Sequence, residues 1–211
     1  MEGIDMSEKS VRSTVKSLEW IYGVVLALSI SEAFMQFASD PNSNVPGIQW
    51  NRLLSLFSFL LLVVPFCHGM SRYFYEMYDK VQTDSHYAIW LLIDCIAFIV
   101  EAGLFFILAR SLPQNLWLQF VSVVVVLLVW DVFWGAFVWK YRTKRISFWV
   151  IINLCTIPLL IVLLLGFYRS DSWWGISLTF LFILARTIAD YWKGWEFYFP
   201  TQQIGSGRYN M

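Results

Sequence analysis

Six stretches of mostly apolar residues run through this chain, and each is long enough to cross a lipid bilayer as a helix. A helix rises about 1.5 Å per residue, so roughly 20 residues cross a hydrocarbon core about 30 Å thick. These stretches predict an all-α, polytopic integral membrane protein with a bundle of six transmembrane helices. In chain order they are 18–38, 51–71, 88–110, 116–139, 147–168 and 173–193.

The composition agrees with a membrane protein. Of the 211 residues, 58% are hydrophobic and only 14% are charged, and the mean hydropathy is +0.59. A soluble domain fills its core with a smaller apolar fraction. The breaks between the stretches are short and polar, so no sizeable soluble domain is expected. The predicted organisation is an N-terminal segment (1–17), a transmembrane domain (18–193) and a C-terminal tail (194–211).

The basic residues predict the orientation of the spans. Six spans place both termini on one side, and that side holds all but three of the 15 Lys and Arg residues, the exceptions being Arg52, Arg110 and Arg169. Cytoplasmic loops carry an excess of Lys and Arg, so both termini are expected in the cytoplasm, with the protein in the cell inner or plasma membrane. Acidic residues precede the first stretch, which is unlike the positively charged start of a signal peptide. We therefore expect this stretch to be a true span.

Four carboxylates lie inside the predicted spans, where an ionised side chain near the bilayer centre costs at least ~2.5–3.5 kcal/mol. They are Glu32, Asp94, Glu101 and Asp131. Arg186 is the one deep arginine, and His68 lies near the inner end of the second span. Because acids outnumber these partners, the surplus must be protonated or in contact with water.

The helical rise gives an expected depth for each acid. Glu32 and Glu101 are expected in the outer half of the bilayer. Asp94 and Asp131 are expected nearer the inner boundary, close to Arg186. Asp94 and Glu101 are seven residues apart, so they should project from one side of their span. The expected result is an outer acidic layer and an inner layer of mixed charge.

Two interpretations of these residues remain open. In the first, the four acids line a pathway for protons or cations, Arg186 sets its electrostatics, and His68 is a candidate pH-sensitive switch. In the second, neutral carboxyls form structural hydrogen bonds between helices, and His68 is an interfacial structural histidine. The first predicts an ion- or proton-conducting channel or transporter. One-sided polar stripes on small membrane bundles also predict a homo-oligomer.

A different class of function is the alternative: a membrane-embedded sensor, scaffold or effector subunit that works with a separate cytoplasmic protein partner, as in a prokaryotic defence complex. The short loops and the lack of a soluble catalytic domain motivate it. No enzyme is expected, because the sequence has no P-loop, GxSxG, dinucleotide-binding or CxxC motif. A membrane-embedded lipid-modifying enzyme that uses carboxylates and a metal is the remaining catalytic alternative.

Cofactors, metals and nucleic acids are not expected partners. Cys67, Cys95 and Cys155 all fall in apolar stretches and are expected to be small buried hydrophobic residues. Two histidines without metal-binding spacing predict no metal site. The basic run at 140–145 is too short for a nucleic-acid site and should lie against membrane lipids.

Overall fold

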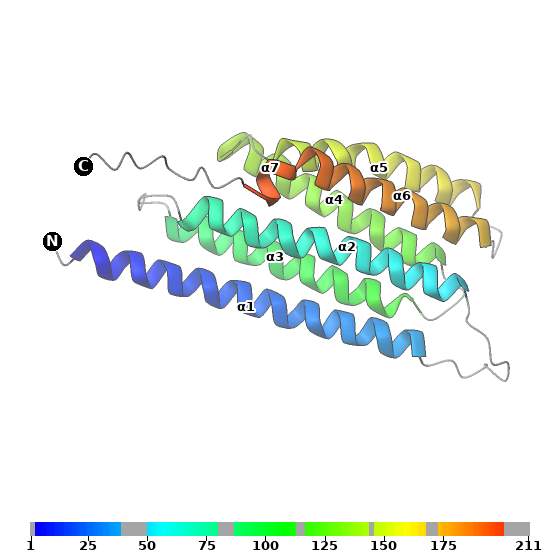
Figure 1. Ribbon diagram of the computed structural model, residues 1–211, viewed down its shortest axis with the longest axis horizontal. Coiled ribbons are helices and arrows are strands. Elements are labelled where there is room, and N and C mark those ends of the chain that lie inside the picture. Colours follow the sequence, from blue (N-terminus) through cyan, green and yellow to red (C-terminus); the bar gives the residue numbers. More distant parts are fainter. Residues whose placement is uncertain are drawn as a thin grey trace, which may run out of the picture.

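The computed structural model describes residues 3–38, 50–79, 87–112, 117–143, 146–167 and 173–200, and every regular element in these ranges is helical. Figure 1 shows the arrangement. The long helices are α1 (Gly3–Ala38), α2 (Trp50–Phe74), α3 (Tyr87–Arg110), α4 (Trp117–Tyr141), α5 (Ser147–Gly166) and α6 (Trp173–Lys193). A π-helical turn, η1 (Tyr75–Asp79), continues α2, and a short helix, α7 (Trp195–Tyr198), follows α6.

Six of the described helices are long and apolar enough to cross a membrane, which confirms the prediction of an all-α chain with six candidate spans. The side of the membrane on which the termini lie stays a prediction. α1 begins and α6 ends at the same end of the bundle (Figure 1). We call this end the terminal end and the opposite end the far end.

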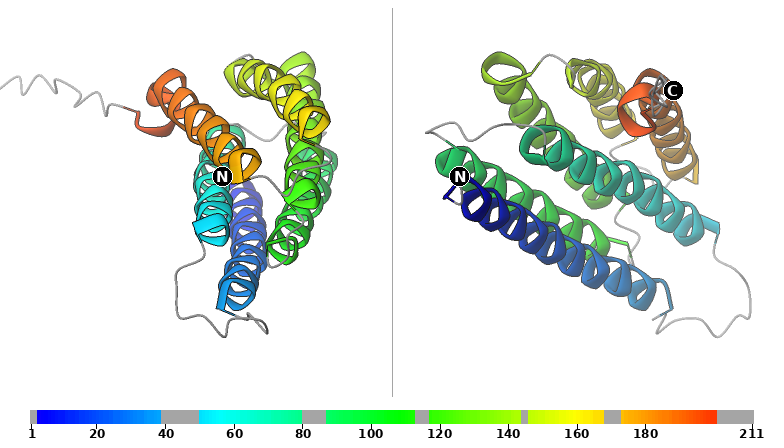
Figure 2. Two further views of the ribbon diagram at one scale, coloured as in Figure 1. Left: turned by 90° about the vertical axis from the view of Figure 1, so that its right-hand side faces the viewer. Right: turned by 60° about the vertical axis from the view of Figure 1, so that its left-hand side comes forward.

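The long helices form a closed ring. Each packs mainly against two neighbours, in the order α1, α3, α4, α5, α6, α2 and back to α1 (Figure 2). This order differs from the order in the chain, because α2 lies between α1 and α6. Side chains that point into the ring from six different helices can therefore meet along its axis.

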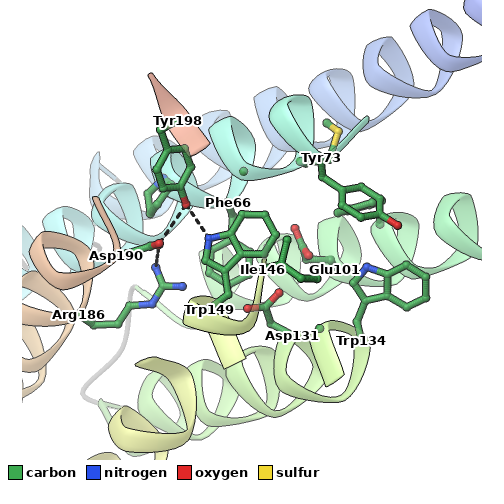
Figure 3. Close-up of a pocket in the computed structure, with 15 residues that line it drawn as sticks. Phe66, Tyr73, Glu101, Asp131, Trp134, Ile146, Trp149, Arg186, Asp190 and Tyr198 are labelled. Carbon is green, nitrogen blue, oxygen red and sulfur yellow. Dashed lines mark hydrogen bonds and ion pairs between the residues drawn. The ribbon is translucent and has the colours of Figure 1, made fainter. Parts of the chain in front are cut away.

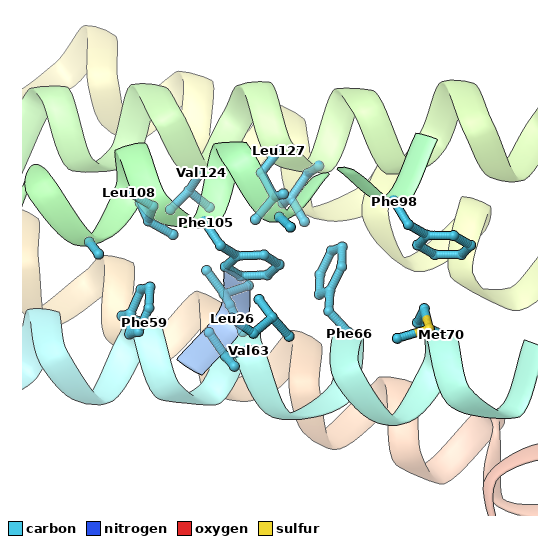
Figure 4. Packing of buried hydrophobic residues seen from close by; sticks show 14 of the residues in the cluster. Leu26, Phe59, Val63, Phe66, Met70, Phe98, Phe105, Leu108, Val124 and Leu127 are labelled. Atoms are coloured by element: carbon cyan, nitrogen blue, oxygen red, sulfur yellow. The ribbon is translucent and has the colours of Figure 1, made fainter. Parts of the chain in front are cut away.

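Large apolar side chains fill the interior of the ring toward the far end (Figure 4). Phe105 on α3 is fully buried and packs edge-on against Phe59 and Phe66 of α2, with ring centroids 6.3 and 5.2 Å apart. We call the following set the apolar layer: Leu26, Phe59, Val63, Phe105, Leu108, Val124 and Leu127. About 14 Å of helix separates Glu101 from Arg110 at the far end of α3, so this layer is thick.

The outer surface of the ring is also apolar. Leu165, Trp192 and Trp20 are among the most exposed large side chains, at 76%, 78% and 71%. Such a surface is costly in water and suits contact with lipid. Cys67 and Cys155 are exposed too, so the expectation of buried cysteines is wrong for these two residues.

Candidate functional site

A cavity of about 30 Å³ lies inside the ring in its terminal half, and we call it the acidic cavity (Figure 3). Its walls come from α2 to α7. A polar space of this size has room for a water molecule or two. Its charged or hydroxyl-bearing lining residues are Tyr73, Glu101, Asp131, Arg186, Asp190 and Tyr198, and the other walls are largely aromatic or apolar.

Arg186 is the only cation among the described residues that line the acidic cavity. Its side chain is buried, and its guanidinium carbon lies 5.0 Å from the centre of the Phe66 ring. Nε donates to Oδ1 of Asn153 at 3.0 Å. Nη1 is 3.1 Å from Oδ2 of Asp190, within ion-pair distance, but it is not aligned for a hydrogen bond to any described residue.

Asn153 on α5 links Arg186 to Asp131 on α4. Its side-chain oxygen accepts from Arg186, and its amide nitrogen donates to Oδ2 of Asp131. The roles of the two amide atoms are thus set by one cation and one carboxylate. Asp131 makes no ion pair with any residue that the structure describes.

Glu101 on α3 is buried and receives a hydrogen bond at Oε1 from the hydroxyl of Tyr22 on α1. Tyr22 is itself buried and packs edge-on against Phe98, with ring centroids 5.9 Å apart. Within the described ranges, Glu101 makes no ion pair either. Two carboxyl groups that have no direct cationic partner there therefore line one interior cavity.

Tyr198 on α7 forms part of the wall of the acidic cavity. Its hydroxyl donates to Oδ1 of Asp190 at 3.0 Å and accepts from Nε1 of Trp149 at 2.9 Å. Burial raises the pKa of Tyr198 well above its usual range, and the negative charge of Asp190 raises it further. The hydroxyl therefore stays protonated and remains a donor to Asp190.

The turn before α7 explains why Tyr198 points inward. A Cβ added to Gly194 would lie 2.6 Å from the Phe148 ring and 2.8 Å from the Tyr198 ring, so only glycine fits. Arg72 on α2 also donates from Nε to the backbone oxygen of Phe197 at 2.9 Å. Tyr198 is not among the residues predicted from the sequence, because it lies in the expected C-terminal tail. The aromatic run WEFYF directly after the last span was the available signal.

Asp94 lies outside the acidic cavity and is fully paired. Its Oδ2 is 2.6 Å from Nη1 of Arg142, and it also accepts hydrogen bonds from the hydroxyls of Tyr73 and Tyr78. Arg142 follows α4 directly, in the basic run that was expected to face lipid headgroups. Asp94 therefore pairs with Arg142 and not with Arg186.

Glu32 lies toward the far end of the bundle, away from the acidic cavity. It accepts a hydrogen bond at 2.6 Å from Nε2 of Gln36, and its Oε1 is 3.8 Å from Nε of Arg110. The Arg110 side chain is 65% exposed. Glu101 therefore shares a cavity with Asp131, and not a separate outer layer with Glu32.

His68 is half-buried on α2 and is not part of the cavity wall. Its ring lies 4.8 Å from the Tyr198 ring, and Nδ1 is 3.5 Å from the hydroxyl of Tyr191. It also lies within electrostatic range of Asp190, which lines the acidic cavity. A role as a pH-sensitive switch stays a prediction.

Of the six residues predicted from sequence, the structure gathers Glu101, Asp131 and Arg186 around one cavity. The other three lie outside it. Comparisons with protein-family models, curated proteins and solved structures found no significant match. The arrangement of side chains is therefore the basis for assigning a function.

Proposed function

We propose that this chain is a multi-pass protein of the cell inner or plasma membrane that moves protons or small cations by means of the acidic cavity. One observation carries the proposal: three carboxyl groups, Glu101, Asp131 and Asp190, line a cavity with one guanidinium group. Three negative charges against one positive charge leave a net charge of −2 if every group is ionised. At bilayer depth such a charge must be removed by protons or balanced by cations or water.

The apolar layer favours a transporter over an open pore. It fills the ring between the acidic cavity and the far end, and its members are almost completely buried. Ions do not cross a dry apolar region of this thickness. We therefore propose that the helices must move to connect the cavity to the far side, as in alternating access.

The distribution of basic residues supports cytoplasmic termini. In that orientation the acidic cavity lies in the cytoplasmic half of the bilayer, and the apolar layer lies toward the outside. Tyr198 on α7 then forms part of the wall on the cytoplasmic side of the cavity.

A single chain already turns Asp94, Glu101, Arg186 and Asp190 inward, where each is at most 4% exposed. Burial of these residues therefore does not require a second copy. The homo-oligomer and the cytoplasmic protein partner stay predictions. Cross-linking in native membranes followed by a pull-down tests both.

The test of the proposed function is flux through purified protein in liposomes. With an internal pH-sensitive dye, wild-type protein should dissipate a pH or cation gradient faster than protein-free liposomes. Glu101→Gln and Asp131→Asn should each slow the flux by at least about tenfold, because each removes a charge change at the cavity. Glu196→Gln is the matched control, since Glu196 is exposed on α7.

Wild-type flux no faster than that of empty liposomes would overturn the proposal. So would unchanged flux in a correctly folded Glu101→Gln variant. The remaining interpretation would then be a sensor, scaffold or effector subunit in which the acids are structural.

A further inference from the structure

The two carboxyl groups without a direct cationic partner offer few oxygen atoms to a ligand. Oε1 of Glu101 is occupied by Tyr22, and Oδ2 of Asp131 is occupied by Asn153. Among the described residues, nothing donates a hydrogen bond to the second oxygen of either group. Each acid therefore has one oxygen to which no described residue donates a hydrogen bond.

These two carboxyl oxygens are better suited to binding a proton than a metal ion. Ca²⁺ takes six to eight oxygen ligands and Mg²⁺ requires a near-octahedral set. Among the described residues, no three His, Cys, Asp or Glu side chains are grouped so that they could hold a metal ion, and Phe66, Phe98 and Trp134 give the cavity apolar walls. A proton needs a single oxygen.

Arg186 adds an electrostatic argument. Its permanent positive charge at the cavity wall offsets one of the three carboxylates and so weakens the attraction of the cavity for a metal ion. The same charge stabilises a carboxylate that remains after a proton has left. Because Asn153 connects Arg186 to Asp131, this stabilisation reaches the acid on α4 through a short chain of hydrogen bonds.

The cavity also has room for the molecule that would carry the proton. Figure 3 shows the carboxyl groups of Glu101 and Asp131 directed into the same space. About 30 Å³ accommodates a water molecule or two between them. A water molecule that accepts from one acid and donates to the other completes the path.

We infer that the species held and released in the acidic cavity is a proton, which Glu101 and Asp131 exchange through water. This inference rests on the proposed function and names its substrate. In the transfer, the O–H bond of protonated Glu101 breaks, the water accepts that proton, and another proton of the water forms an O–H bond on the Asp131 carboxylate. Glu101 ends ionised, Asp131 ends protonated, and the water is regenerated.

Other titratable groups surround the pair and belong to the same equilibrium. Tyr22 is the positioning residue for Glu101, since its hydroxyl holds one carboxyl oxygen in place. The groups that face the two acids or complete the walls are Tyr22 from α1, Tyr73 from α2, Arg186 and Asp190 from α6, and Tyr198 from α7. Cys67 on α2 is exposed, but it lies within electrostatic range of Glu101.

Infrared spectroscopy of the reconstituted full-length protein tests the inference without measuring flux. Wild-type protein should show the C=O stretching band of a protonated carboxylic acid, and the band should decrease as pH is raised. Glu101→Gln and Asp131→Asn should each change this band, and Glu196→Gln should not. Tyr22→Phe should shift its frequency, because the hydrogen bond to Oε1 is lost while the acid remains.

Metal ions are the second arm of the experiment. Adding Na⁺, K⁺ or Ca²⁺ at constant pH should leave the band unchanged. Loss of the band on addition of a cation would overturn the inference, as would absence of the band at every pH at which the protein is folded. If Glu101→Gln does not fold, Asp131→Asn gives the same test.

The two proposals fail in different ways. A protonated band without flux in liposomes would contradict the proposed function and leave the proton site intact. Flux driven by a cation gradient, together with no protonated band, would contradict the proton site and leave the transport function intact.

Discussion

Arg142 and Asp94 form an ion pair between the residue that follows α4 and the first half of α3, with 2.6 Å between Nη1 and Oδ2. Asp94 is fully buried, and the Arg142 side chain is 12% exposed. Arg142 also donates to the hydroxyls of Tyr73 and Tyr78. Every charge in this cluster is thus paired, which distinguishes it from the acidic cavity beside it.

We expect Arg142→Gln to destabilise the protein by roughly 3–5 kcal/mol, because it leaves Asp94 buried without its cation. Chemical unfolding in detergent micelles measures the change. The double variant Asp94→Asn with Arg142→Gln should recover part of the loss, since no unpaired charge remains.

Arg110→Gln is the matched control for this prediction. It removes a cation whose side chain is 65% exposed and 3.8 Å from Glu32, so its cost should be below about 1 kcal/mol. Equal costs for the two arginine variants would show that the Asp94 pair contributes no special stability.

Tyr198→Phe should open the terminal side of the acidic cavity. It removes the hydrogen bonds to Asp190 and Trp149, which together hold α7 closed. A loss of about 1–3 kcal/mol corresponds to a roughly 5- to 150-fold increase in the population of the open form. Labelling of Glu101 by a water-soluble carbodiimide, followed by mass spectrometry, measures this change.

Phe199→Leu is a control for the labelling experiment, because Phe199 is exposed and follows α7 directly. It should label at nearly the wild-type rate. If Tyr198→Phe also labels at the wild-type rate, α7 is not the barrier on this side.

The stabilising effect of Tyr198 should depend on pH at the alkaline end. Its pKa in the folded protein is raised by burial and by Asp190, whereas an unfolded tyrosine ionises near about pH 10. Unfolding above that pH therefore releases a proton, and the contribution of the tyrosine to stability falls as pH rises. The difference in melting temperature between wild type and Tyr198→Phe should shrink from pH 8 to about pH 10.5. A constant difference over this range would contradict the raised pKa.

Phe105→Ala should weaken the apolar layer. Phe105 is fully buried between Phe59 and Phe66, and truncation of such a ring typically costs about 3–5 kcal/mol. The space that remains adjoins the acidic cavity, so we expect a proton leak through the bundle in liposomes. Phe57→Ala, at an exposed position on α2, should lower stability less than Phe105→Ala does. It should also raise the leak rate less. If liposomes that contain Phe105→Ala leak protons no faster than those with wild type, another part of the interior is the barrier to protons.

The candidate spans could be predicted from the sequence because hydrophobic length is a local property. All six stretches are helices in the structure, and the polar breaks fall between them. The presence of Glu101, Asp131 and Arg186 inside candidate spans followed from the same hydrophobic lengths. Hydrophobic length does not determine how each helix is rotated about its axis or which helices are its neighbours.

The rotation of each helix and the identity of its neighbours decided which partner each acid meets. Asp94 and Arg142 are 48 residues apart and meet because α3 packs beside α4 in the ring. Glu101 meets Tyr22 because α1 packs beside α3, and Tyr198 reaches the cavity because the chain reverses at Gly194. The sequence by itself determined that surplus acids lie inside candidate membrane-spanning helices, since apolar length and composition are local properties. Only the tertiary structure decided that Glu101 and Asp131 are acids without an ion pair to any described residue, because ion pairing depends on the packing of helices that are distant in the chain.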